Sequence, residues 1–380
     1  MTALDTSDPV ALALALVDIP SVSGDEGVIA DSVEAALSGR PHLEVLRDGD
    51  TVVARTHAHR DRRVVIAGHL DTVPISGNVP GRLEQRDGVD VLWGRGSVDM
   101  LSGVACALHL AVELTEPRHD VTWVFYDHEE VAADLNGVGR VASHHPDWLA
   151  GDLRGRGLPE DREIPREPVG EPTAAQIEGG CNGTLRVIAT IPGVAAHSAR
   201  SWRGDNAIHR AAPVIARIAD FGNPVVSVDG LDYRESLSVV RIEGGTANNV
   251  VPDVVTLVVN YRFAPSSTGE RALDVVRGVF DGSGARLVVD DLSEGARPGL
   301  DSAIAGEFLD AARRASGGRI TVGPKYGWTD VARFSGLGIP ALNFGPGDPM
   351  LAHTIDEHVP TEQIRRCARV LRSWLGREEE

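Results

Sequence analysis

Two short apolar runs, each followed at once by acidic residues and a histidine, constrain the fold of this chain most. Residues 64–67 (Val-Val-Ile-Ala) lead through a glycine into residues 69–71, and residues 121–126 (Val-Thr-Trp-Val-Phe-Tyr) lead into residues 127–130. Runs of this kind are typical of strands buried in a parallel or mixed sheet. Between them, the Ala- and Leu-rich segment 101–114 is predicted to be a helix. The pattern predicts an α/β fold with polar groups at strand ends, where such folds place their sites.

The middle of the chain has a different pattern, which predicts a second domain. Its elements are expected in the order β-α-β-β-α-β, the ferredoxin-like split unit. The expected strands are 184–192, 237–242, 254–263 and 286–289, and the expected helices are 205–218, with Asp205 as its cap, and 269–280. A further buried strand is expected at 341–344, so the chain returns to the first domain after this insertion.

The predicted fold is therefore a discontinuous α/β domain with an inserted domain. The first domain comprises residues 1–180 and 294–380, with a mixed, mostly parallel sheet flanked by helices, and the inserted ferredoxin-like domain comprises residues 181–293. Residues 151–170, rich in Gly, Pro, Arg and Glu, are expected to form a loop. A chain of 380 residues is long enough for two to three domains.

Composition excludes several classes of partner. The net charge of −18, from 55 acidic and 37 basic residues, argues against nucleic acid and anionic membranes. No apolar stretch approaches the ~20 residues of a transmembrane helix. The apolar run 10–17 has acidic neighbours and no basic residue before it, so it is expected to be the first helix and not a signal peptide. Ser7 or Asp8 is its expected cap, with Pro9 at the first helical position.

The cysteines point to the compartment. Cys106, Cys181 and Cys367 are few, odd in number and far apart, unlike a disulfide framework. Free thiols suit a reducing environment, so a cytoplasmic location is expected.

Clusters of acidic residues and histidines lie in order along the chain and form a candidate metal site. They are His69 with Asp71, Asp99, Glu129 with Glu130, Glu171, and His353. Zinc takes imidazole nitrogen and carboxylate oxygen readily, and a catalytic zinc keeps one position open for water or substrate. Because the set contains no cysteine, it favours a hydrolytic site over a structural zinc finger.

Taken alone, each cluster also has an ordinary interpretation. An isolated His-x-Asp is more often part of a surface loop, and Asp99 stands where a helix cap would. Glu171 is weaker evidence still, and lone histidines such as His353 and His197 are usually structural or on the surface.

Two adjacent glutamates are most often a solvated charged pair. The side chains of Glu129 and Glu130 diverge because the residues are neighbours, and this suits a division in which one binds metal and the other faces the water to be deprotonated. Spacing alone leaves Asp127 and His128 open as further contributors.

As a set, these segments resemble the di-zinc aminoacylase/carboxypeptidase family over nearly the whole chain. The segments that carry the resemblance are 68–74, 94–100, 129–130, 171–173 and 352–354. Within the family, the likeness is closest to an actinobacterial subgroup of desuccinylases. The segments that indicate the subgroup are 183–187, 196–202, 204–209, 325–334 and 343–349.

The resemblance implies two Zn²⁺ per subunit, with Co²⁺ or Mn²⁺ as possible substitutes. It implies that Asp99 bridges the ions, that His69 and Glu171 complete one, and that Glu130 and His353 complete the other. It also implies that Asp71 supports His69, and that Glu129 acts as general base and then as general acid.

The resemblance also implies that the inserted domain serves as a dimerisation and lid domain. The resemblance implies a homodimer in which His197 reaches the scissile carbonyl of the other subunit. Asn249 and Arg262 match positions that contact substrate in relatives, and Gly327 lies in a subgroup segment. Arg200, Arg203 and Arg262 are the candidates for holding a substrate carboxylate, because the chain has one lysine and arginine binds carboxylates in bidentate fashion.

The implied reaction is hydrolysis of N-succinyl-L,L-2,6-diaminopimelate to succinate and L,L-diaminopimelate, a step of lysine and cell-wall precursor synthesis. The alternatives are another N-acyl-amino-acid deacylase of the acetylornithine type, a glutamate-releasing carboxypeptidase, and a non-catalytic relative. The last is disfavoured because the full set of ligands and the base are present. Two departures from relatives are Leu101, where a lysine is usual, and Cys181-Asn182 before Gly183, where many desuccinylases carry an arginine pair.

Overall fold

The computed structural model describes residues 4–150 and 167–377, which form two compact units. The first unit comprises residues up to Gly179, Gly299–Val322, and the chain from Arg333 onward. The second comprises Gly180–Pro298 and Gly323–Ala332. The first unit is therefore discontinuous in sequence.

The first unit is built on an eight-stranded mixed sheet with the strand order β1-β2-β6-β3-β7-β18-β8-β17. In that order, the strands are Leu43–Asp48, Thr51–Thr56, Asp120–Tyr126, Arg63–His69, Glu167–Val169, Ala341–Asn343, Ile177–Gly179 and Val322–Pro324. The central strands β6, β3, β7 and β18 are parallel. The pairs β1–β2, β2–β6 and β18–β8 are antiparallel. The predicted mixed sheet is confirmed, but its parallel part is limited to the centre.

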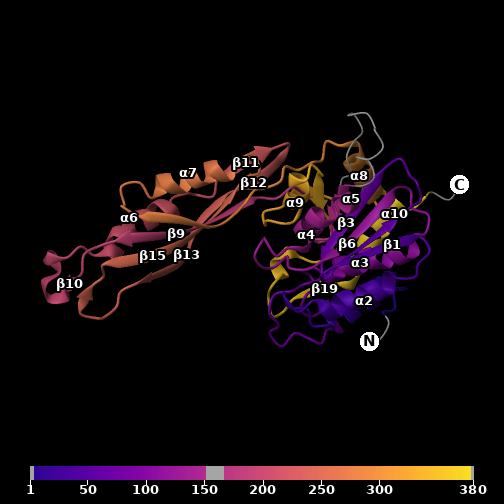
Figure 1. Cartoon of the computed structure of the whole chain (residues 1–380), viewed down its shortest axis with the longest axis horizontal. Coiled ribbons are helices and arrows are strands. Elements are labelled where there is room, and N and C mark those ends of the chain that lie inside the picture. The colour runs from indigo at the N-terminus through magenta and orange to yellow at the C-terminus, as the bar shows by residue number, and fades with distance from the viewer. Residues whose placement is uncertain (1–3, 151–166, 378–380) are drawn as a thin grey trace. The chain divides into compact units, whose positions relative to one another are not determined.

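Helices cover both faces of this sheet (Figure 1). A buried apolar cluster holds one group of helices against one face, namely α1 (Pro9–Val17), α2 (Gly27–Leu37), α3 (Leu101–Glu113), α8 (Ala303–Ala315) and α10 (Thr361–Leu375). α4 (Gly137–His144) contacts β1, β2 and β6, and α5 (Pro146–Ala150) and α9 (Val331–Gly336) complete the helices. The expected cap of α1 is confirmed, because the Asp8 carboxylate accepts a hydrogen bond from the Val10 N–H.

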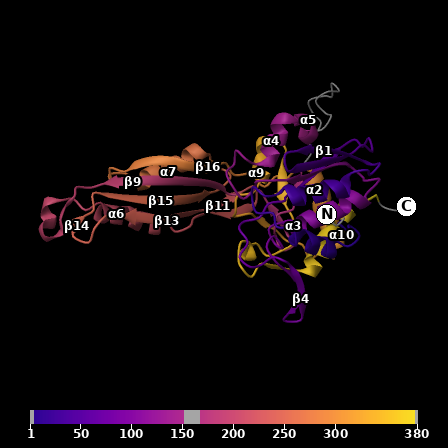
Figure 2. The same cartoon turned by 60° about the horizontal axis from the view of Figure 1, so that its bottom comes forward.

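A smaller sheet of the first unit has the strand order β19-β5-β4. Its strands are His358–Pro360, Val89–Trp93 and Arg82–Arg86, and the β4–β5 hairpin projects from the unit (Figure 2). The Arg82 guanidinium stacks over the Trp93 ring at 3.6 Å. Within the described part of the chain, no helix has the length and apolarity required to cross a membrane.

The second unit has the predicted β-α-β-β-α-β order. Its main elements are β9 (Gly183–Pro192), α6 (Ala207–Ala219), β13 (Ser236–Gly244), β15 (Val254–Phe263), α7 (Gly269–Val279) and β16 (Arg286–Ser293). The antiparallel sheet has the order β13-β15-β9-β16, the order of a ferredoxin-like sheet, and α6 and α7 share its buried apolar cluster.

Two small additions mark opposite ends of the second unit (Figures 1 and 2). At one end lie β10 (Ala196–His197), β14 (Val250–Val251) and the short helix η2 (Ser198–Arg203). At the other end lies the hairpin of β11 (Val225–Val228) and β12 (Leu231–Arg234). The β10 end is called the tip here, and it comprises residues 194–205 and 247–252.

Three sequence predictions differ from the structure in detail. The cap of α6 is Asn206 and not Asp205, since the Asn206 side chain accepts from two backbone N–H groups of the first turn. Residues 167–169, expected to be loop, form β7, because they pair with β3 and β18; residues 151–166 of that predicted loop lie outside the described residues.

The domain limits also differ. Residues 294–298 and 323–332 group with the second unit, although the sequence placed them in the first. The reason is local hydrogen bonding: Cys181 pairs with Ala296, and the Lys325 carbonyl accepts from the Asn182 N–H at 3.2 Å.

Candidate metal centre

The candidate centre begins where the parallel strands β3 and β6 end side by side. His69 is the last residue of β3 and lies opposite Tyr126, the last residue of β6. The Leu70 N–H then donates to the Tyr126 carbonyl at 2.7 Å. The segments that follow the two strands therefore leave the sheet at the same edge, as expected for a site in an open α/β sheet.

Asp71 joins these two segments. Its fully buried carboxylate accepts hydrogen bonds from the backbone N–H groups of Glu129 at 2.9 Å and Glu130 at 3.0 Å, and from the Ser23 hydroxyl at 2.7 Å. Burial raises the pKa of Asp71, but the contacts with His69, the Glu129 N–H and Ser23 outweigh it and lower the pKa to about 2. Asp71 is thus a fixed anion that holds both glutamates at the sheet edge.

His69 is oriented by the same residue. Its Nδ1 lies 2.9 Å from the Asp71 carbonyl oxygen and 3.4 Å from Asp71 Oδ1. An N–H at Nδ1 satisfies the carbonyl and leaves the Nε2 lone pair for a metal, the usual arrangement of a ligating histidine. Burial opposes a charge on this imidazole, but its hydrogen bonds to Asp71 and Asp99 raise the pKa of His69 well above the usual value.

Asp99 lies between the two histidines. Its Oδ1 is 3.2 Å from His69 Nε2, and its Oδ2 is 3.2 Å from His353 Nε2. His353 Nε2 is also 2.8 Å from Glu130 Oε1. Its hydrogen bond to Asp99, and to a smaller extent the one to Glu130, raises the pKa of His353 to about 10. Burial alone would raise the pKa of Asp99, but the hydrogen bonds from His353 and His69 lower it. One carboxylate therefore offers a separate oxygen to each imidazole.

Glu357 holds the backbone of Asp99 in place. Its buried carboxylate accepts from the Val98 N–H at 3.0 Å and the Asp99 N–H at 3.1 Å, and pairs with the Arg95 guanidinium at 2.7 Å. Burial raises the pKa of Glu357. The peptide bond between Asp99 and Met100 is cis.

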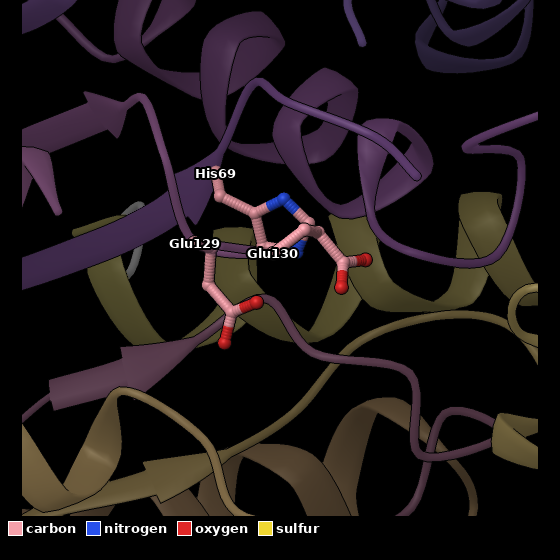
Figure 3. A group of neighbouring side chains, drawn as sticks. All are labelled: His69, Glu129 and Glu130. Carbon is pink, nitrogen blue, oxygen red and sulfur yellow. The ribbon is translucent and has the colours of Figure 1, made fainter. Parts of the chain in front are cut away.

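Two groups of potential ligands meet here. Atoms of His69, Glu129 and Glu130 lie within 4.8 Å of one another, as do atoms of Asp99, Glu130 and His353. Figure 3 shows the carboxylates of the two glutamates diverging from adjacent backbone positions beside the His69 ring. Imidazole nitrogen and carboxylate oxygen suit zinc and also manganese and cobalt. The residues present thus fit a pair of divalent ions.

Glu171 is placed by strand register. Val169 of β7 lies opposite Ala67 of β3 in parallel pairing, so Glu171 and His69 each follow two residues later at the same edge. Glu171 is 5% exposed. Among the described residues, it belongs to neither of the two groups above, and its role as a ligand stays a prediction.

Asp127 and His128, which the sequence left open, support the segment of Glu129 and Glu130. Asp127 is buried and accepts from the Thr51 hydroxyl and the Arg140 guanidinium. His128 has a φ of 59°, in the left-handed region, and its Nδ1 lies 2.7 Å from Asp127 Oδ2. Such a conformation in a non-glycine residue is held by its surroundings and is common at functional sites.

The supporting residues were missed in the sequence. They are Ser23, Glu26, Thr51, Arg140 and Glu357. Glu26 is fully buried and accepts from the His128 N–H at 3.2 Å, and burial raises its pKa. Sequence spacing carries no signal for these partners, because each acts on a segment far away along the chain.

The second unit brings together three predicted residues at the tip. His197 pairs with Val250 across β10 and β14, and the Ser198 N–H donates to the Asn249 carbonyl at 2.8 Å. Arg200 lies in η2, in which no residue is buried. His197, Asn249 and Arg200 are all exposed, and the His197 Nδ1 accepts from the Ala199 N–H at 3.0 Å.

Arg262 and Gly327 lie at the opposite end of the second unit. Arg262 is near the end of β15, opposite Thr184. The 323–332 segment, which includes Gly327, meets the same end through the Lys325–Asn182 contact. Arg262 is half-buried, burial lowers its pKa, and no carboxylate among the described residues hydrogen-bonds to it. Along β15, Arg262 is eight residue steps from Val254, about 26 Å at ~3.3 Å per residue.

Comparison with known proteins gives consistent matches. Residues 65–377 match the family model described as Peptidase family M20/M25/M40. The chain is 49% identical over 370 residues to a Mycobacterium tuberculosis protein assigned as succinyl-diaminopimelate desuccinylase DapE, covering 97% of this chain and 98% of that protein. It is 46% identical over 377 residues to the succinyl-diaminopimelate desuccinylase of Corynebacterium glutamicum, covering 97% and 96%.

Solved structures share the fold at low identity. The aminopeptidase PepT of Bacillus cereus matches with a TM-score of 0.71 and 20% identity, over 98% of both chains. The YXEP protein of Bacillus subtilis, described as a dinuclear metal-binding peptidase, matches with a TM-score of 0.64 and 18% identity, over 96% of both chains.

Proposed function

Because the chain belongs to the M20/M25/M40 peptidase family, we propose that it is a metal-dependent amide hydrolase acting on N-succinyl-L,L-2,6-diaminopimelate. The products are succinate and L,L-diaminopimelate. The observation that carries the proposal is the identity of 46–49% over nearly the full length to two proteins named as desuccinylases for this substrate. The arrangement of His69, Asp99, Glu130 and His353 supports it, because an inactive relative has no need to keep these groups together.

The residues at the sheet edge would hold two divalent ions, zinc in the native enzyme. Asp99 would be shared by both ions, His69 and Glu171 would hold one, and Glu130 and His353 would hold the other. The separate contacts of Asp99 Oδ1 and Oδ2 with the two histidines support the bridging role. When bound, such ions lower the pKa of a water and polarise the carbonyl of the amide.

Glu129 moves the proton in this scheme. It accepts the proton of the attacking water and later delivers it to the leaving amine. Two observations support the assignment. Glu130 already contacts His353, and Asp71 fixes the backbone of both glutamates so that their side chains point in different directions.

Arg262 holds a carboxylate of the substrate, with Gly327 as a further contact at the same end of the unit. Asn249 and Arg200 are further contacts from the tip that also carries His197. A half-buried guanidinium to which no carboxylate of the described residues hydrogen-bonds is a ready site for an anionic group. The substrate is anionic and the chain carries a net charge of −18, so local cations of this kind are required.

His197 acts across a homodimer formed through the inserted domain. Within the second unit, the tip and Arg262 are about 26 Å apart along β15. A substrate of this size does not span that distance, so one subunit does not supply both contacts. His197 of the partner subunit then stabilises the oxyanion that forms at the scissile carbonyl. The exposed side chains of Val240 (59%) and Ile242 (50%) on the edge strand β13 support a contact with a second copy.

The three buried free cysteines agree with a cytoplasmic enzyme.

Side-by-side turnover assays test the substrate. With zinc or cobalt supplied, we expect release of succinate from N-succinyl-L,L-diaminopimelate and much slower hydrolysis of N-acetylornithine. Activity on N-acetylornithine alone would identify the acetylornithine-type deacylase instead. Loss of all hydrolysis on chelation, with recovery on adding metal, separates a metal enzyme from a non-catalytic relative.

A pair of variants tests the roles of the two glutamates. Glu129→Ala is expected to keep near-normal metal content and lose most activity, whereas Glu130→Ala is expected to lose metal. Metal content is measured on protein dialysed against a fixed zinc concentration. If Glu129→Ala lost the metals and Glu130→Ala kept them, the two roles would be exchanged.

A further inference from the structure

The tip of the second unit carries the most exposed tryptophan of the described chain. Trp202 lies in η2 with 79% of its surface exposed, and no residue of η2 is buried. Val194 in the tip is 55% exposed, and Ile208 in the first turn of the adjoining α6 is 38% exposed. An exposed tryptophan of this kind is costly in water and is enriched in protein–protein contacts.

The loop is held in place even though nothing covers it. Backbone hydrogen bonds join Ser198 N to Asn249 O at 2.8 Å, Gly204 N to Ser201 O at 3.1 Å, and Val194 N to Asp205 O at 2.7 Å. The loop therefore presents Trp202 in a fixed position, and a surface ordered in advance loses less conformational entropy on binding.

The loop is also basic on an acidic chain. Residues 196–204 include His197, Arg200 and Arg203 and no acidic residue, while the whole chain has a net charge of −18. Within the described residues, neither arginine has an ion-pair partner. A complementary surface is expected to combine exposed apolar side chains with uncompensated acids.

The rim of the candidate metal centre has this composition. Val131 follows Glu130 directly, and Met350 and Ile355 flank His353; these three apolar side chains are 43%, 81% and 67% exposed. Because Glu130 Oε1 and His353 Nε2 are 2.8 Å apart, the two rim segments meet at the ligands. The rim also exposes Asp134 and Asp348.

We propose that the loop 197–203 of one subunit docks on this rim of a second copy, with Trp202 packing against Met350 and Ile355 of the partner subunit. This rests on the proposed action of His197 in the dimer, and it assigns Trp202 as the anchor that brings His197 to the site. The chain enters and leaves the second unit at the Cys181–Ala296 end, whereas the tip lies at the far end of β9, some 30 Å away. The tip is thus the part of the unit available to another copy.

Cysteine cross-linking tests the docking without any substrate. The native cysteines are buried, so a double variant Ser201→Cys, Val131→Cys, which keeps Trp202 and its proposed partners Met350 and Ile355, offers two reactive thiols. With a short bis-maleimide, we expect a covalent dimer on a denaturing gel. A cross-linked monomer, or no cross-link in a sample that is dimeric by light scattering, would overturn the proposal. The control Val225→Cys, Val131→Cys uses the opposite end of the second unit and is expected to give no cross-link.

Kinetics then test the role of Trp202 as an anchor. We expect Trp202→Ala to lower kcat/KM at least about tenfold, with unchanged metal content and dimer mass, and Trp202→Phe to restore most of the loss. The control Val225→Ala removes an apolar group that is 52% exposed at the other end of the unit, and it is expected to leave kcat/KM unchanged. Normal kinetics of Trp202→Ala would overturn the assignment. If the wild type fails to hydrolyse N-succinyl-L,L-diaminopimelate, the proposed function fails, and the cross-link still decides the docking.

Discussion

Gly103 offers a sharp test of how packing positions the metal ligands. It lies inside α3, where alanine is favoured over glycine by ~1 kcal/mol. A Cβ at this position would approach the Gly170 carbonyl oxygen at 2.3 Å, against at least 3.4 Å for an ordinary contact. The backbone of Gly170 must therefore move by about 1 Å, and Glu171 follows it directly.

The backbone of Gly170 and Glu171 is also closely packed against Gly345. A Cβ at Gly345 would meet the Gly170 carbonyl oxygen at 2.2 Å and the Glu171 carbonyl oxygen at 2.6 Å. Overpacking of a core costs ~1–3 kcal/mol. With the helix propensity gained, Gly103→Ala is expected to lower the free energy of unfolding by only ~0–2 kcal/mol. A shift of about 1 Å at Glu171, the proposed ligand, is expected to lower kcat/KM by ~100-fold.

Gly306→Ala in α8 is the matched control. Nothing lies within 4 Å of a Cβ at Gly306, so this variant is expected to be more stable by ~0.5–1 kcal/mol with normal activity. The measurements are thermal melts by circular dichroism, metal content at limiting zinc, and kcat/KM. Full activity and full metal content in Gly103→Ala would refute the claim that the contact between α3 and Gly170 positions Glu171.

Three further outcomes are expected. Arg140→Met leaves the buried Asp127 carboxylate without its cation and should cost ~1–3 kcal/mol in thermal unfolding, whereas Arg313→Met, which removes an exposed pair, should change stability by less than ~0.5 kcal/mol. The native protein should not react with a thiol reagent at pH 8, since the cysteines are buried and the pKa of Cys106 is raised to about 12, and three thiols should titrate after unfolding. In the metal-free protein the pKa of His353 is raised to about 10. The bound proton therefore stabilises the folded state fully below the ordinary pKa of histidine, and this contribution is lost as the pH rises through about 10. Metal uptake near pH 7 should release this proton, so calorimetry in buffers of different ionisation enthalpy should detect the release, and the metal affinity should fall with decreasing pH.

The sequence predicts much of the fold because hydrophobic runs and turns are local signals. The apolar run of residues 121–126 and the alternating segment 254–263 coincide with β6 and β15 almost to the residue. The segment 167–169 was misassigned because it contains a proline and only three strand residues, and its pairing with β3 and β18 is decided by distant segments. The hairpin β11–β12 was missed for a similar reason, as its strands are only four residues long.

The site is predictable to the extent that ligands occupy strand ends. His69, Asp99, Glu130 and His353 come together as predicted, because β3 and β6 end side by side and the segments before α3 and after β18 join them. Family resemblance supplied the choice of these residues from among many acids and histidines. The supporting carboxylates stay hidden in the sequence, since a buried Glu26 or Glu357 looks the same there as a surface glutamate.

Two buried carboxylates, Asp71 and Glu357, hold ligand segments in place through the backbone. Asp71 accepts the N–H groups of Glu129 and Glu130, and Glu357 accepts those of Val98 and Asp99. The segments of Glu129 and Glu130 and of Asp99 are thus fixed through their backbone by a carboxylate from elsewhere in the chain, and not by the candidate ligand side chains themselves. Because backbone N–H donors also offset the charge of the buried acids, the order of the site comes from the polypeptide. The ligand side chains then remain available for the metal, which agrees with a site built for an ion that takes part in chemistry and not for one that holds the fold together.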